Sequence, residues 1–168
     1  NWVLLPMLGS LREESKRIVE DATRRGIPCE GLRLILHCGE DFRSLNEGLR
    51  RLHEPIEFGY LQHEDRVGHA LALGIDVDQF LREQPDSVER AEDRLENLIW
   101  EWSLYESGAL RAPRDRLSCI ENTIQKLGRD IYSVDVPLQV HVQARALRMN
   151  GWHLERWRYP RMYAPVPT

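Results

Sequence analysis

The spacing of apolar positions divides the first half of the chain into short strands and amphipathic helices. Residues 2–8, 32–37 and 66–69 are predicted strands, and the second is apolar without strict alternation, which is typical of a parallel strand buried on both faces. Apolar residues recur at helical spacing over residues 10–25 and 42–53. The order strand–helix–strand–helix–strand predicts an α/β protein with a parallel sheet.

The second half carries helical patterns. An apolar stripe runs from Val88 to Tyr105 over about five turns. A further helix is predicted from Asp115 to Gly128, and a last one over about residues 136–149. No strand is predicted after residue 75.

Local end signals refine these predictions. Ser10 with Glu13, and Asp86 with Glu89, have the spacing of capping boxes, which predict helix starts. Gly26 is predicted to end the first helix. The change from mixed to helical patterning falls near residues 76–86, so two regions are expected. They are residues 1–76, with alternating strands and helices, and residues 77–168, which are helical.

Composition narrows the class of protein. The 168 residues suffice for one domain with a hydrophobic core, and a net charge of −4 argues against a nucleic-acid binder. No apolar run approaches the length of a bilayer span, and three cysteines form no disulfide framework, so a cytoplasmic location is expected. The opening at Asn1 reads as a strand already under way, which predicts a fragment of a longer chain.

Two histidines and a glutamate follow predicted strands. His37 ends the strand over 32–37, and Gly39 permits a sharp turn that brings Glu40 back toward the imidazole. His69 follows Gly68 at the end of another strand. Because the carboxyl ends of parallel strands carry the active sites of barrels and open sheets, these residues are candidates for metal-assisted hydrolysis. A histidine at a strand end that serves only structure is the simpler alternative.

Other features have a structural explanation that we prefer. Cys38 is expected to be a small buried residue and not a metal ligand. Trp100, Trp102 and Tyr105 could stack a base, but a stripe at helical spacing is more often core or a subunit interface. Residues 153–163 interleave arginine with aromatic residues, which suits single-stranded nucleic acid, yet a packed loop or subunit contact fits an acidic chain better.

Two motifs carry a resemblance to the adenosine deaminase family. HCGED at residues 37–41 resembles the family's HAGE motif, and DRVGHALALG at 65–74 resembles its DRIGHG-type motif. The resemblance covers about residues 1–76. It looks closest to the divergent deaminases of bacterial antiphage systems, first the deaminase subunit of RADAR defence and second the CRISPR-associated adenosine deaminase. The helical stretch with IWEWSLYESG also resembles an insertion of that group.

The resemblance implies a fold, a cofactor and residue roles. The fold would be a fragment of a (β/α)8 TIM-type barrel with a largely helical insertion. His37 would ligate Zn2+, Glu40 would protonate the purine ring, and His69 would orient and deprotonate the attacking water. Gly9 and Gly39 would contact the substrate. The expected reaction is hydrolytic deamination of adenosine or an adenine nucleotide to the inosine form.

The chain departs from the family pattern in two places. The family's HxH pair and its Asp-Asp pair, which supply the other zinc ligands, are absent. His141 is expected inside a helix, and Asp76 and Asp78 flank a valine too early in the chain. Because a catalytic zinc needs three protein ligands, the 168 residues alone are expected to be inactive and to belong to a larger catalytic chain.

The resemblance also implies partners, and it leaves alternatives. A purine nucleoside or nucleotide substrate, a homo-oligomer and a defence-system ATPase partner are expected, without a membrane or nucleic-acid partner. One alternative is a non-catalytic module for assembly or partner binding, derived from a degenerate barrel. Another is an amidohydrolase-type zinc enzyme with a different substrate.

Overall fold

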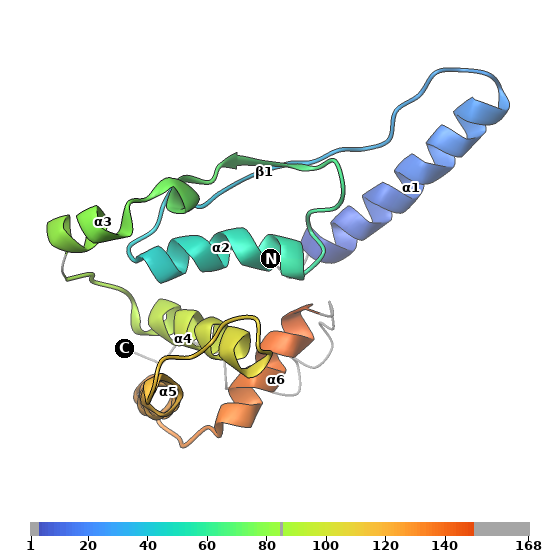
Figure 1. Cartoon of the computed structure of the whole chain (residues 1–168). Helices are drawn as coiled ribbons and strands as arrows, with labels where there is room; N and C mark the ends of the chain where they lie inside the picture. Colours follow the sequence, from blue (N-terminus) through green and yellow to red (C-terminus); the bar gives the residue numbers. More distant parts are fainter. Residues whose placement is uncertain (1–3, 85, 150–168) are drawn as a thin grey trace.

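The computed structural model describes residues 4–84 and 86–149 (Figure 1). The protein is mixed α/β and mostly helical. In chain order the elements are α1 (Leu4–Arg24), β1 (Ile35–Cys38), α2 (Leu45–Glu57), β2 (Arg66–His69), the short 3-10 helix η1 (Leu71–Gly74), α3 (Val77–Glu83), α4 (Ala91–Glu106), α5 (Arg116–Tyr132) and α6 (Leu138–Met149).

The strands β1 and β2 form a two-stranded parallel sheet, joined by the crossover helix α2. Ile35 pairs with Arg66, and the register runs to Cys38 opposite His69. This confirms the strand predicted over residues 66–69, the parallel pairing and the α/β class. Within the described residues the sheet has two strands, so the closed barrel stays a prediction.

The strand predicted over residues 2–8 is wrong for its described part, because α1 already begins at Leu4. Pro6 lies in the first turn of this helix, where a missing N–H costs no hydrogen bond. The capping box predicted at Ser10 is therefore also wrong, since Ser10 lies inside α1. The predicted end is confirmed: α1 stops at Arg24, and Gly26 has a positive φ of 69°.

Two more predictions about elements are wrong, and one helix was missed. The strand β1 is not buried on both faces, because the Ile35 residue is 63% exposed. The helix α4 begins at Ala91 without a side-chain cap, so the capping box at Asp86 and Glu89 is wrong. The Glu89 carboxylate instead accepts a hydrogen bond from Asn97 Nδ2 (3.1 Å). The helix α3 was not predicted.

Gly128 does not end α5, which continues to Tyr132. It is buried in the middle of the helical packing, and a β-carbon there would stand 2.8 Å from Nε2 of His141 in α6. The glycine therefore allows close approach of two helices instead of terminating one. The prediction that His141 lies in a helix is confirmed.

The main hydrophobic core lies between α4, α5 and α6. The apolar stripes predicted for these helices supply it, and Trp100 is 6% exposed, which confirms its assignment to the core. The buried cluster consists of Leu95, Leu98, Ile99, Ile120, Ile124, Ile131 and Leu138. No helix in the described parts of the chain has the length and apolar character needed to cross a membrane.

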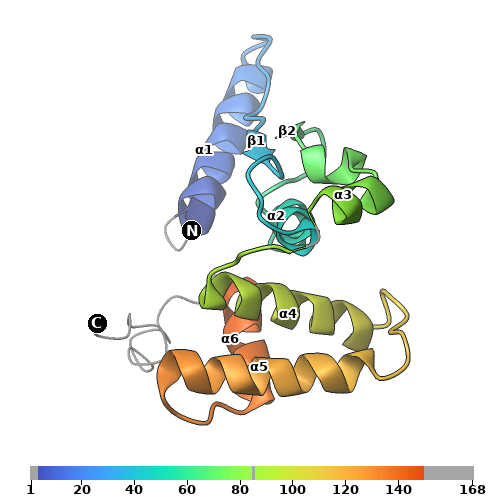
Figure 2. The same cartoon turned by 90° about the vertical axis from the view of Figure 1, so that its left-hand side faces the viewer.

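The helix α2 lies between the two strands and the helical half (Figures 1 and 2). Its contacts to α4 are polar. Asn46 Nδ2 donates to Glu101 (2.9 Å), and Arg50 Nε donates to Asn97 Oδ1 (2.7 Å). These buried bonds join the strand-bearing region to the core of the helical region.

Candidate functional site

The two candidate histidines meet at the ends of the parallel strands. The ring centroids of His37 and His69 are 4.8 Å apart, with the rings nearly perpendicular at 81°. His37 is the third residue of β1 and His69 is the last residue of β2. Both residues are exposed, so the paired imidazoles are open to a ligand.

Gly68 makes room for the His37 ring. The strand register places His37 opposite Gly68, and paired residues of parallel strands project to the same face. A β-carbon on residue 68 would stand 2.3 Å from Cδ2 and 2.8 Å from Nε2 of His37. Any side chain at this position would therefore displace the imidazole.

A left-handed turn directs His69 toward His37. Regular alternation would put His69 on the same face as its partner Cys38, opposite to His37. Instead His69 has a φ of 64° and Ala70 has a φ of 52°, and each non-glycine residue in this region costs about 1–3 kcal/mol. The amide of Ala70 donates to the Cys38 carbonyl (3.1 Å), which holds this strained turn against β1. Strain retained beside paired histidines is typical of a functional site.

A second turn, after β1, is held by α2. Gly39 has a φ of 78°, and a β-carbon there would stand 2.7 Å from Cγ of Leu52 in α2. The Gly39 carbonyl accepts a hydrogen bond from the amide of Ala72 (3.0 Å). The turns after β1 and β2 are thus tied together, and Gly39 has a packing role in addition to any contact with a substrate.

Glu40 emerges from this turn with one oxygen unsatisfied. Its Oε2 atom is buried and has no hydrogen-bond partner within the described residues. A buried carboxyl oxygen without a partner is costly, so a ligand that forms a hydrogen bond with it would be stabilised there. The acid–base role expected for Glu40 stays a prediction, and the structure shows that one of its oxygens has no partner.

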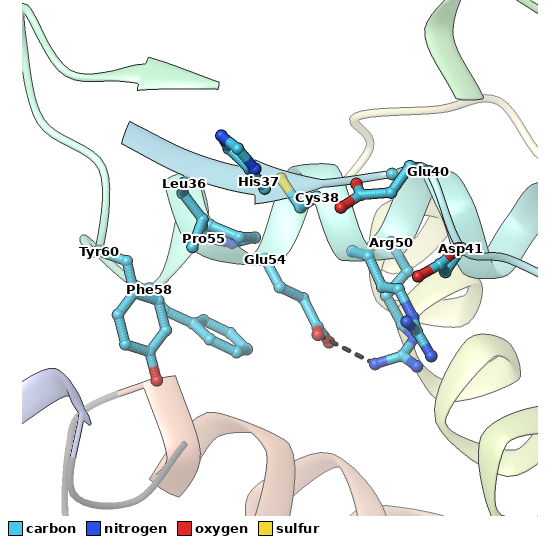
Figure 3. A pocket seen from close by; sticks show the side chains of 12 residues that line it. Leu36, His37, Cys38, Glu40, Asp41, Arg50, Glu54, Pro55, Phe58 and Tyr60 are labelled. Atoms are coloured by element: carbon cyan, nitrogen blue, oxygen red, sulfur yellow. Dashed lines mark hydrogen bonds and ion pairs between the residues drawn. The ribbon is translucent and has the colours of Figure 1, made fainter. Parts of the chain in front are cut away.

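A cavity of about 400 Å³ opens between the end of β1 and α2 (Figure 3). Glu40 and His37 line it from the strand side, and Arg50 and Glu54 line it from α2. Arg50 Nη1 donates to Glu54 Oε2 at 3.0 Å, the dashed line in Figure 3. Phe58 adds an aromatic surface. The wall of the cavity is therefore already charged and ordered by its own ion pairs.

Two titrating groups at the cavity favour their neutral forms. Burial raises the pKa of the Cys38 thiol, and the negative charge of Glu40 raises it further. Burial and the charge of Glu54 likewise raise the pKa of Tyr60. Because metals bind the thiolate, this environment disfavours Cys38 as a ligand. Cys38 is half-buried, somewhat less than the sequence suggested.

The histidine pair supplies part of the donor set that zinc needs. His37 and His69 offer two imidazoles, which are good zinc ligands, but a catalytic site needs three protein ligands. Across residues 4–84 and 86–149, no group of three or more His, Cys, Asp or Glu side chains could hold a metal ion. The histidine pair fits zinc as part of a site, and these residues alone do not complete it.

The remaining predicted residues lie elsewhere. Gly9 is an exposed position inside α1, with nothing within 4 Å of where a β-carbon would stand. Asp76 caps α3 by accepting from the amide of Gln79 (2.9 Å), so it serves the helix start. His53 is half-buried, and its Nδ1 accepts from Trp100 Nε1 (3.2 Å).

Sequence reasoning missed two contributors to this site. Gly68 was noted beside His69, but its role toward His37 depends on the strand register. Asp65, the first residue of the DRVGH segment, was given no role, and its buried carboxylate proves to join the starts of both strands. The feature of the sequence that could have indicated this role is the position of Asp65 directly before a predicted strand.

Comparison with known proteins adds no assignment. No protein-family model matches the chain, and no curated protein matches it.

Proposed function

We propose that this chain is part of a zinc-dependent deaminase that converts adenosine or an adenine nucleotide to the inosine form. The observation that supports this most is the pairing of His37 with His69 over Gly68 at the carboxyl ends of parallel strands. Histidine pairs at this edge suit metal-assisted hydrolysis. The resemblance of the two motifs supplies the substrate class.

Each residue has a distinct role in this proposal. His37 would be one ligand of the zinc, and the other ligands would come from further segments of the full-length protein. The chemistry that zinc supplies when bound is activation of water near neutral pH. His69 would orient that water and accept a proton from it, and Glu40 would donate a proton to the ring nitrogen beside the attacked carbon. Ammonia is the leaving group.

The unpartnered Oε2 of Glu40 supports its role. A protonated carboxyl group is a donor, and a purine ring nitrogen is an acceptor, so the two would satisfy each other. Glu40 also discriminates among zinc hydrolases, because an enzyme acting on a simple amide has no ring nitrogen to protonate. Antiviral defence, a homo-oligomer and an ATPase partner belong to the same proposal and rest on the resemblance.

The test is zinc content and ammonia release from adenosine and from ATP, measured on the longest natural form of the protein. The variant Glu40→Gln keeps the size of the side chain and removes the acid. Asp41→Asn is the matched control, because Asp41 is the exposed neighbour of Glu40.

We expect bound zinc in all three proteins, with ammonia release lost in Glu40→Gln by about a hundredfold or more and kept in Asp41→Asn. Zinc without ammonia from either substrate would favour a hydrolase with another substrate. Absence of both would favour a non-catalytic assembly module.

A further inference from the structure

Asp65 lies immediately before β2 and has the most completely bonded carboxylate near the histidine pair. Its side chain is 2% exposed. Oδ1 accepts from the amide of Leu34 (2.8 Å), and Oδ2 accepts from the amide of Gln62 (2.8 Å) and from Arg12 Nη2 (2.5 Å). One side chain thus connects α1, the start of β1 and the turn before β2.

These bonds set the register of the two strands. Leu34 precedes β1, and its carbonyl accepts from the amide of Arg66 (2.8 Å), the first residue of β2. The N–H of Leu34 therefore donates to the side chain of Asp65, and its C=O accepts from the amide of the next residue, Arg66. A parallel strand held at its first residue cannot slip along its partner without breaking both bonds.

The register matters because the histidine pair depends on it. His37 has room for its ring only where its partner lacks a β-carbon, and Gly68 is the glycine of β2. A shift by one residue would place Val67 or His69 opposite His37. Either side chain would occupy the space of the imidazole.

The charge of Asp65 is held in place as well. Burial raises the pKa of Asp65, but hydrogen bonds from Leu34, Arg12 and Gln62 outweigh it, so the pKa is lowered. Arg12 is also fixed, since its Nη2 donates to the Tyr60 carbonyl (2.7 Å). An ionised carboxylate only accepts, whereas an asparagine amide would turn its NH2 group toward at least one of these donors.

We propose that Asp65 is the positioning residue of the histidine pair: its carboxylate fixes the register in which Gly68 faces His37 and His69 reaches the ring. The fixed strand register follows from the hydrogen bonds of Asp65. Its catalytic consequence rests on the proposed function.

The test is NMR of the full chain with carbon-labelled histidine, with the wild type and the variants recorded in the same buffer and at the same pH. The chain has six histidines, so ring signals can be assigned by single substitutions. We expect a ring-to-ring cross-peak between His37 and His69 in the wild type, and its loss in Asp65→Asn. Asp76→Asn makes the same substitution at the cap of α3, where an asparagine oxygen can still accept from the amide of Gln79, so it is the control and should keep the cross-peak.

A cross-peak that persists unchanged in Asp65→Asn would overturn the proposal, even if the melting temperature fell. If that variant does not fold, Asp65→Ser takes its place, because a serine hydroxyl can still accept one of the backbone bonds in the turn. An unchanged cross-peak in Asp65→Ser would equally overturn it.

A zinc titration of the longest natural form of the protein separates this inference from the proposed function. If both hold, Asp65→Asn weakens zinc binding about tenfold or more, as loss of a residue that orients ligands does. If wild type and variant both bind no zinc while the cross-peak is lost in the variant, the proposed function fails and the positioning role stands.

Discussion

The imidazole of His37 lies directly over the backbone of Gly68, so close that a β-carbon on residue 68 would stand 2.3 Å from Cδ2 of the ring. This relationship explains why a glycine stands one residue before His69. It also makes the geometry of the histidine pair sensitive to a single methyl group.

The first prediction concerns Gly68→Ala. The added methyl group should displace the His37 ring, abolish the His37–His69 contact, and lower deamination by the longest form of the protein about a hundredfold. Ammonia release together with histidine NMR checks this. Gly74→Ala is the control, because nothing lies within 4 Å of a β-carbon at residue 74. Normal activity in Gly68→Ala would argue against a catalytic role for the pair.

The second prediction concerns the buried ion pairs of Arg145 in α6. Its side chain is 4% exposed, and it binds Glu57 and Glu54 of α2. Arg145→Leu removes the arginine that binds Glu57 and leaves Glu54 with Arg50, so we expect a loss of about 3 kcal/mol in the free energy of unfolding. Urea unfolding measures it.

The matched control is Arg129→Gln. Arg129 pairs with Asp135 at 2.7 Å, but the two side chains are 63% and 80% exposed. Exposed pairs contribute about 0–1 kcal/mol, so this variant should unfold close to the wild type. Equal losses in both variants would mean that Arg145 does not hold α6 to α2.

The third prediction concerns the pH dependence from His141. Burial lowers the pKa of His141 below its ordinary value of 6.5, although the charge of Glu96 in α4 opposes this. Its Nε2 has no hydrogen-bond partner in the described structure, and the Tyr132 ring lies 6.1 Å away. The unfolded chain therefore binds a proton that the folded chain resists, so stability should fall as pH drops below 6.5.

His141→Leu should flatten this decline, as urea midpoints measured above and below pH 6.5 would reveal. His63→Gln should leave the decline unchanged, because His63 is exposed. A decline that is equally steep in His141→Leu would assign the pH dependence to other groups.

The fourth prediction concerns Gly9 in α1. Glycine inside an exposed helix costs about 1 kcal/mol relative to alanine, and a β-carbon at residue 9 has open space. Gly9→Ala should therefore raise the free energy of unfolding by about that amount. The resemblance predicted a substrate contact at this glycine, so a simultaneous loss of deamination would support that contact.

Local sequence patterns correctly predicted the strand β2 and the helices that bury an apolar face. β2 was placed at its observed bounds, and α6 was predicted because Leu138 and Val142 share a helical face that packs on the core. The run at residues 4–8 misled because an apolar stretch of that length fits a strand and a helix equally. Residues 4–8 are helical because they continue into the longer helix that follows them.

The candidate site was predictable in its residue types and not in its geometry. The sequence placed His37 and His69 at strand ends, and the parallel register then brought them together. The left-handed turn at His69 and the bonds of Asp65 to Leu34 depend on contacts between distant segments. No local pattern carries that information.

The central claim is that Glu40 and the histidine pair belong to a hydrolytic deaminase. Its most direct test is mass spectrometry of adenosine and ATP after incubation with the zinc-loaded, longest form of the protein in heavy-oxygen water. We predict an inosine-type product that carries the heavy oxygen, formed by the wild type and absent with Glu40→Gln. Unchanged adenosine and ATP with the zinc-loaded wild type would contradict the account.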